Sequence, residues 1–107
     1  MKKKASIRII DAEFHGDNYV EIEVNQVIGN FAIHKPLHLS DRYRWTVTHV
    51  PSGAVACNAR TLKIARDAIE SFQRLDFINW EETRPLDKLT KGQMEQARHI
   101  RQIADNA

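Results

Sequence analysis

The sequence has a single cysteine, Cys57, among its 107 residues. One thiol excludes an intramolecular disulfide and a zinc site made of several cysteines. The four glycines are dispersed along the chain, so it has no glycine-rich loop of the kind that holds a phosphate. No apolar run approaches the roughly 20 residues that span a bilayer. The basic start reaches Asp11 and Glu13 too soon for a secretory signal, and we therefore expect a cytoplasmic protein without a membrane partner.

The composition is that of an ordinary folded protein, with 42% hydrophobic and 28% charged residues. The chain also lacks internal repeats and low-complexity linkers. A length of 107 residues is enough for one domain with a modest core. We expect a single domain over residues 1–107, with a flexible basic N-terminus at 1–5 and a connector between two helices at 81–89.

Alternating apolar and polar residues predict strands, and turn residues separate them. The turn signals are HGDN at 15–18, Gly29-Asn30 and Pro51-Ser52-Gly53. Pro36 stops the third strand or confines it to a sheet edge, because proline has no backbone donor. The predicted strands cover residues 6–14, 19–27, 31–34, 42–50 and 54–57.

Two helices are predicted after the strands. Thr61 is a suitable N-cap for the first helix, and Thr90 with Gln93 forms a capping box for the second. Each helix has apolar residues at three- and four-residue spacing. In the first these are Leu62, Ala65, Ala68, Ile69, Phe72 and Leu75; in the second, Met94, Ala97, Ile100, Ile103 and Ala104. The predicted fold class is α+β: a four- to five-stranded, mainly antiparallel sheet followed by two C-terminal helices, the first packed on one sheet face.

Charges of one sign gather in blocks, although the net charge is only +2. Residues 1–8 and 35–66 are basic, whereas residues 9–34 and 67–82 are acidic. We expect these blocks to pair with one another across neighbouring strands. The alternative is that they steer a charged partner toward the protein.

The start of the first helix is the strongest candidate for a binding site. Arg60, Lys63 and Arg66 lie at its N-terminus, where the helix dipole favours anions. A bound phosphate would stabilise this arrangement. The alternative is pairing within the helix, Lys63 with Asp67 and Arg66 with Glu70.

The segment TLKIARDAIESF at 61–72 resembles the last helix of double-stranded-RNA-binding domains, which also opens with a hydroxyl residue and lysines. The resemblance implies phosphate contacts by Lys63 and Arg66. The chain departs from that family in three respects. Leu62 stands where a further lysine is expected, no helix precedes the strands, and an extra hairpin and a second helix are present.

Arg42 and Arg44 are a second basic candidate. They alternate with the aromatic residues Tyr43 and Trp45, so arginines and rings point to opposite faces of a strand. A sheet that reads RNA needs exposed rings for base stacking. The two arginines can instead pair with acidic residues of a neighbouring strand, namely Glu21 and Glu23.

Two aromatic residues after the first helix, Phe77 and Trp80, are candidates for contact with a partner protein, because aromatic anchors dominate interface energetics. The alternative is that they close one end of the core.

Catalytic and metal sites have little support. His49 and Cys57 can be neighbours in a hairpin, but nothing near Cys57 lowers the pKa of its thiol, and we expect a buried residue. His34 and His38 are separated by Pro36, which excludes the helical spacing of a metal pair. No carboxylate pair lies in an apolar context. We expect no enzyme activity, no metal and no cofactor.

The sequence favours a small non-enzymatic binding or regulatory protein that acts through contact with another protein. Its size class is common among phage and mobile-element accessory factors, including inhibitors of host defence. The alternative is a nucleic-acid-binding module that uses Lys2 to Lys4 and the basic helix start. A homodimer is a further expectation, through the edge strand limited by Pro36 or through the C-terminal helix.

Overall fold

The computed structural model of the chain describes residues 5–10, 19–36 and 42–107. The predicted turn at 15–18, residues 11–14 of the first predicted strand and residues 1–4 of the N-terminus lie outside these ranges. The elements are β1 Ala5–Ile10, β2 Tyr19–Val24, β3 Gln26–Ile28, β4 Phe31–His34, β5 Trp45–His49, β6 Ala54–Ala59, α1 Leu62–Gln73 and α2 Lys91–Asn106.

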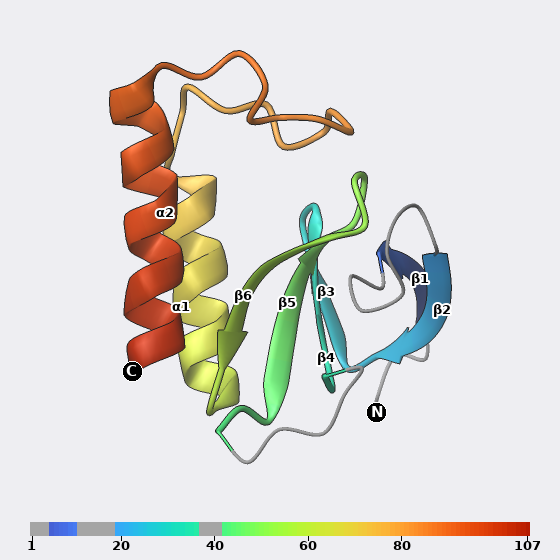
Figure 1. The fold of residues 1–107 in the computed structure, drawn as a ribbon. Coiled ribbons are helices and arrows are strands. Elements are labelled where there is room, and N and C mark those ends of the chain that lie inside the picture. The colour runs from blue at the N-terminus through green and yellow to red at the C-terminus, as the bar shows by residue number, and fades with distance from the viewer. Residues whose placement is uncertain (1–4, 11–18, 37–41) are drawn as a thin grey trace.

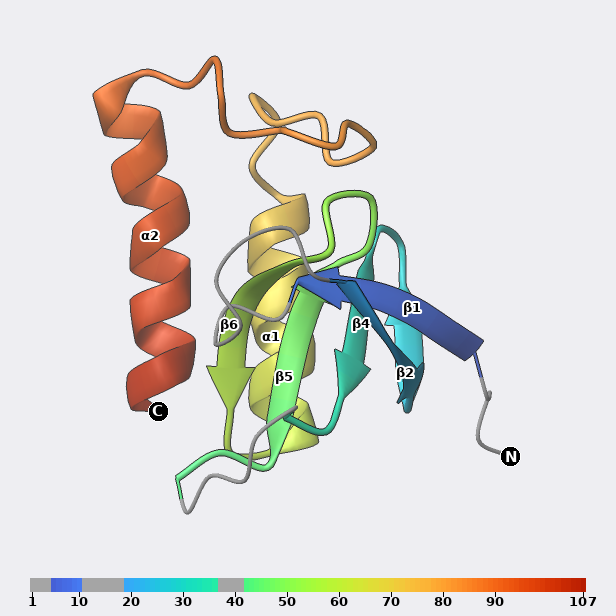
Figure 2. The ribbon, with the colours of Figure 1, turned by 45° about the vertical axis from the view of Figure 1, so that its right-hand side comes forward.

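The elements form three layers (Figures 1 and 2). The middle layer is a four-stranded antiparallel sheet in the order β3-β4-β5-β6. Both helices lie on one side of this sheet, and β1 and β2 cross its other face as a separate two-stranded sheet. The predicted α+β class, with an antiparallel sheet followed by two helices, is confirmed.

The predicted strand over 19–27 is divided between the two sheets. β2 pairs with β1 as far as Val24, and β3 starts two residues later and pairs with β4. Between them, the backbone N–H of Asn25 donates to the carbonyl oxygen of Ile33 at 2.8 Å. This bond keeps the chain attached to the middle sheet where it changes partners.

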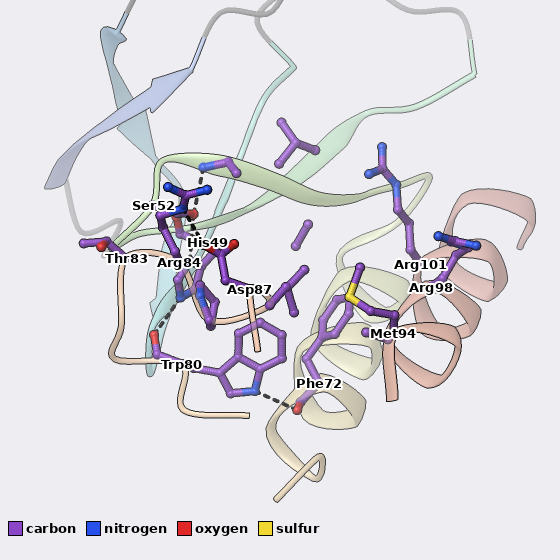
Figure 3. Close-up of a pocket in the computed structure, with 16 residues that line it drawn as sticks. His49, Ser52, Phe72, Trp80, Thr83, Arg84, Asp87, Met94, Arg98 and Arg101 are labelled. Carbon is purple, nitrogen blue, oxygen red and sulfur yellow. Dashed lines mark hydrogen bonds and ion pairs between the residues drawn. The ribbon is translucent and has the colours of Figure 1, made fainter. Parts of the chain in front are cut away.

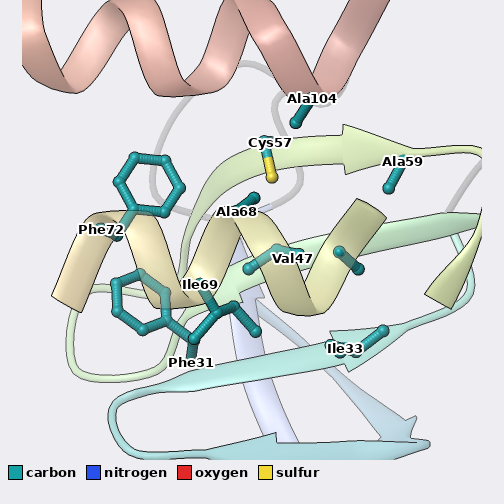
Figure 4. Close-up of a cluster of buried hydrophobic side chains, with 10 residues drawn as sticks. Phe31, Ile33, Val47, Cys57, Ala59, Ala68, Ile69, Phe72 and Ala104 are labelled. Carbon is teal, nitrogen blue, oxygen red and sulfur yellow. The ribbon is translucent and has the colours of Figure 1, made fainter. Parts of the chain in front are cut away.

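The main core lies between α1 and the middle sheet (Figure 4). Thr61 caps α1 as predicted, since its hydroxyl accepts from the N–H of Ile64 at 3.1 Å. The apolar face of the helix then packs on β4, β5 and β6. The rings of Phe31 and Phe72 stack with their centroids 5.6 Å apart. Other buried members of this core are Ile33, Val47, Cys57, Ala65, Ala68 and Ile69.

The opposite face of the middle sheet is also buried, and it carries polar side chains. Thr46 donates to the Oδ1 of Asn58 at 2.9 Å, and the Nε2 of His34 lies 2.6 Å from the hydroxyl of Thr48. A small apolar cluster of Val24 and Ala32, with Ile22 and Val50 packed against it, joins this face to β2. The β1–β2 layer therefore covers polar groups that are hydrogen-bonded to one another.

The second helix packs beside β6. Its capping box forms as predicted: the backbone N–H of Gln93 donates to the hydroxyl of Thr90, and the backbone N–H of Thr90 donates to the side-chain oxygen of Gln93. Near its end, Asp105 accepts from the N–H of Asn58 through Oδ1 and from the hydroxyl of Tyr43 through its carbonyl oxygen, both at 2.8 Å. Of the apolar residues at helical spacing, Ala97 and Ala104 are buried, whereas Ile103 is 58% exposed. Among the described residues, no helix is both long enough and apolar enough to cross a membrane.

Candidate functional site

A cavity of about 360 Å³ opens between the edge strand β6, the segment that joins the helices and the first half of α2 (Figure 3). The turn between β5 and β6 borders it on one side. Its walls therefore come from residues 49–56, from Phe72, from residues 80–87 and from residues 94–101, which the fold brings together. Its volume lies within the range of about 300–1,000 Å³ that is typical of ligand pockets.

Much of the cavity wall is apolar. The rings of Phe72 and Trp80 and the side chain of Met94 line it. Val55 and Leu86 also line it, and each is 36% exposed. These two belong to the small set of large apolar side chains that are exposed in the described part of the chain. The cavity thus presents apolar surface to the solvent.

His49 connects the turn to the segment between the helices. Its Nε2–H donates to the carbonyl oxygen of Trp80 at 2.6 Å, and its Nδ1 accepts from the hydroxyl of Ser52 at 2.7 Å. Burial lowers the pKa of this imidazole, and the bond to the Trp80 carbonyl partly opposes that effect. The neutral ring that results fits these two partners, one acceptor and one donor.

The turn between β5 and β6 explains why the Ser52 hydroxyl lies near His49. The same Oγ accepts from the N–H of Ala54 at 3.1 Å and lies 3.3 Å from the carbonyl oxygen of His49. Gly53 follows with φ of 73°, a conformation that glycine adopts without strain. These contacts are those of a serine that closes a tight turn.

Cys57 and His49 do not form a nucleophile and base. The thiol is fully buried, and burial, with a smaller contribution from the Asp105 carboxylate, raises its pKa to about 12. Both nitrogens of His49 are engaged elsewhere. The prediction of a buried cysteine is confirmed.

Three arginines line the cavity together with one aspartate. In the view of Figure 3, Arg84 is on the side of the cavity where His49 and Ser52 lie, whereas Arg98 and Arg101 project from α2 on the opposite side. Each arginine has an acidic neighbour in sequence. The pairs are Arg84 with Asp87 at 2.8 Å, Arg98 with Glu95 at 2.9 Å and Arg101 with Asp105 at 3.5 Å.

Two of the three basic residues predicted at the start of α1, Lys63 and Arg66, have partners within the protein. Lys63 pairs with Asp67 at 2.8 Å as expected, and this hydrogen bond raises the pKa of the ammonium group. The expected pair of Arg66 with Glu70 was wrong. Arg66 instead donates from Nε to the Oε1 of Gln26 at 3.0 Å, and Glu70 pairs with Arg74. The helix packs on β4, and β3 pairs with β4, which brings Gln26 within reach of Arg66.

Arg42 and Arg44 precede β5 rather than lying in it. Arg42 donates to the Oδ1 of Asn106 at 3.3 Å and lies 5.3 Å from the centre of the Tyr43 ring. The backbone N–H of Arg44 donates to the carbonyl oxygen of Ala59 at 3.2 Å, so Arg44 and Arg60 lie at the same end of the sheet.

The acidic partners proposed for Arg42 and Arg44 belong to β2, which is in the other sheet. That pairing is therefore not one between neighbouring strands. In the register of β1 with β2, Arg8 lies opposite Glu21. The register thus sets one basic position opposite one acidic position, and pairing of the charged blocks stays a prediction.

Trp80 closes one end of the main core and also lines the cavity. Its ring meets that of Phe31 edge-on at 5.0 Å, and its Nε1–H donates to the carbonyl oxygen of Phe72 at 2.9 Å. Phe77 is half-buried, and Ile78 beside it is buried. Contact of Phe77 or Trp80 with a partner stays a prediction.

The described residues contain no group of three metal-ligating side chains. The cavity itself was missed in the sequence, because its lining comes from segments that only the fold brings together. The available signal was the three-residue spacing of Arg98 and Arg101 on one helix face.

Comparisons of the chain with protein-family models, with curated protein sequences and with solved structures find no match.

Proposed function

We propose that this chain is a non-enzymatic binding protein that acts through contact with another protein at the cavity between β6 and α2. The observation that supports the proposal is an apolar cavity whose lining includes the partly exposed side chains Val55 and Leu86. Exposed apolar surface of this kind often marks an interaction site.

The cavity suits the anchor side chain of a partner. Interface energy is concentrated in a few side chains that enter well-packed pockets. Phe72 and Trp80 belong to the core, and the hydrogen bonds of Trp80 to Phe72 and His49 hold the wall in place. A preformed wall lowers the entropic cost of binding. Occupation of this surface would let a small domain regulate its partner by covering it.

A matched pair of charge insertions tests the site. Val55→Glu places a carboxylate in the cavity wall, whereas Val27→Glu places one on β3, at the other edge of the same sheet. The exposures of Val55 and Val27 are similar, at 36% and 42%. The tagged protein would be used to capture its partner from source cells, and cross-links would locate the contact.

The expected result is that Val55→Glu loses the captured partner and Val27→Glu keeps it, with cross-links near the cavity. Retention of the partner by Val55→Glu, or its loss in Val27→Glu alone, would place the interface elsewhere. Circular dichroism of both variants checks that each one is folded.

Nucleic-acid binding is the second candidate function, and one observation favours it. The pairing of β5 with β6 brings Arg44 beside Arg60, at the N-terminus of a helix whose first turn has no acidic residue. Mobility-shift assays with duplex and single strands at low salt test it, with Arg44→Glu/Arg60→Glu as the variant. The absence of binding at low salt would exclude this function.

A further inference from the structure

We infer that the segment bound in the cavity is an acidic peptide segment that inserts one apolar side chain between α2 and β6. The inference rests on the proposed function and adds the chemistry of the partner. The exposed side chains Val55 and Leu86 indicate only that the anchor of the partner is apolar. The charges around the apolar wall indicate that the rest of the peptide is acidic.

The charged residues that line the cavity are mostly cationic. Three are arginines and only Asp87 is acidic. The arginines lie on both sides of the opening, Arg84 next to the β5–β6 turn and Arg98 with Arg101 on α2 (Figure 3). An occupant with carboxylates on either side of an apolar residue matches this arrangement.

These arginines can leave their existing ion pairs and bind a carboxylate of the partner instead. In the pair of Arg98 with Glu95, both side chains are 57% exposed. The pair of Arg101 with Asp105 is long, at 3.5 Å, and Asp105 already accepts from the backbone of Asn58. An exposed pair such as that of Arg98 with Glu95 contributes little to stability. A guanidinium therefore stays available for a bidentate bond to a partner carboxylate.

The wall favours an apolar anchor but does not require one particular side-chain shape. Phe72 and Trp80 provide fixed ring surface, whereas Met94 is flexible and adapts to different neighbours. A nucleic acid would need exposed ring faces on which bases stack. Here the ring of Trp80 meets Phe31 and Phe72 edge-on and helps to close the core. The arrangement thus favours a peptide over a nucleotide.

A pair of synthetic peptides tests the inference on the full chain by isothermal titration calorimetry. Both peptides have blocked ends and a central leucine, with glutamates on each side in one and glutamines in the other. The glutamate peptide is expected to bind more tightly, and the difference should shrink as salt screens the charges. Arg84→Gln and Arg98→Gln should each weaken its binding about two- to fivefold.

Arg74→Gln is the matched control, because Arg74 is an exposed arginine in an intrahelical pair and is not part of the cavity wall. It should leave the affinity unchanged. Equal affinity for the two peptides, no binding of either, or displacement of the glutamate peptide by an oligonucleotide would overturn the inference. If Val55→Glu still abolished capture of the partner in any of these cases, the proposed function would stand and only the acidic chemistry would fail.

Discussion

At the scale of single residues, the pair of His34 and Thr48 is the most sensitive point of the polar face. Both side chains are fully buried, and the Nδ1–H of His34 already donates to the carbonyl oxygen of Lys35 at 2.7 Å. The Nε2 therefore depends on the Thr48 hydroxyl as its donor. A buried acceptor that loses its donor is costly, whereas water would replace the donor at an exposed site.

Thr48→Val should consequently lower the free energy of unfolding by about 1–3 kcal/mol, because it preserves the shape and removes the donor. Urea denaturation measures this change. Thr83→Val is the control, since Thr83 is exposed and the expected change is within about 0.5 kcal/mol. Equal stability of Thr48→Val and the unmodified protein would show that the hydrogen bond has no net effect.

At the scale of elements, Trp80 connects the segment between the two helices to both α1 and β5. Trp80 bonds to α1 through its indole N–H and to β5 through its carbonyl oxygen. The segment is otherwise largely exposed between residues 81 and 88. Its position over the end of the core, and with it one wall of the cavity, thus depends on Trp80.

Trp80→Ala should destabilise the protein toward the lower end of about 3–5 kcal/mol, because the ring is half-buried. Trp80→Phe retains a ring and loses the donor to Phe72, so its cost should be about 1 kcal/mol. Leu86→Ala, in the same segment, should change stability little. Thermal and urea unfolding of the three variants measure these changes, which should be largest for Trp80→Ala. An equal effect of Leu86→Ala and Trp80→Ala would contradict the prediction.

The elements that the sequence predicts well are those set by local rules. The caps at Thr61 and Thr90 and the apolar face of α1 depend on residues within a few positions of each other. The division of the second strand at Asn25 depends on which sheet each half joins. The bond of Arg66 to Gln26 likewise depends on where α1 lies over the sheet.

At the scale of the whole molecule, the candidate site is even harder to predict from the sequence. Arg84, Arg98 and Val55 meet only because α2 folds back beside β6 and the connecting segment crosses the end of the core. The basic residues near the N-terminus of the first helix suggested a site at the start of α1. There, Lys63 and Arg66 have partners within the protein, and the cavity between β6 and α2 lies elsewhere.

The fold also buries a histidine on each face of the middle sheet, which links the stability of the whole domain to pH. Burial lowers the pKa of both His34 and His49 below the ordinary value of 6.5, with hydrogen bonds to backbone carbonyls partly opposing the shift. The unfolded chain therefore binds more protons than the folded one at acidic pH. Stability contributed by these groups is present at neutral pH and is lost as the pH falls below about 6.5 toward the lower folded values.

The urea midpoint should thus decrease between about pH 7 and pH 5. Each histidine lowers the free energy of unfolding by at most about 1.4 kcal/mol per pH unit. His34→Gln should reduce this pH dependence, because it removes one of the two buried titrating groups. His99→Gln is the control, since His99 is exposed on α2, and its pH profile should match that of the unmodified protein. A midpoint that stays constant or rises toward pH 5 would show that the two rings bind protons as readily in the folded protein as in the unfolded chain.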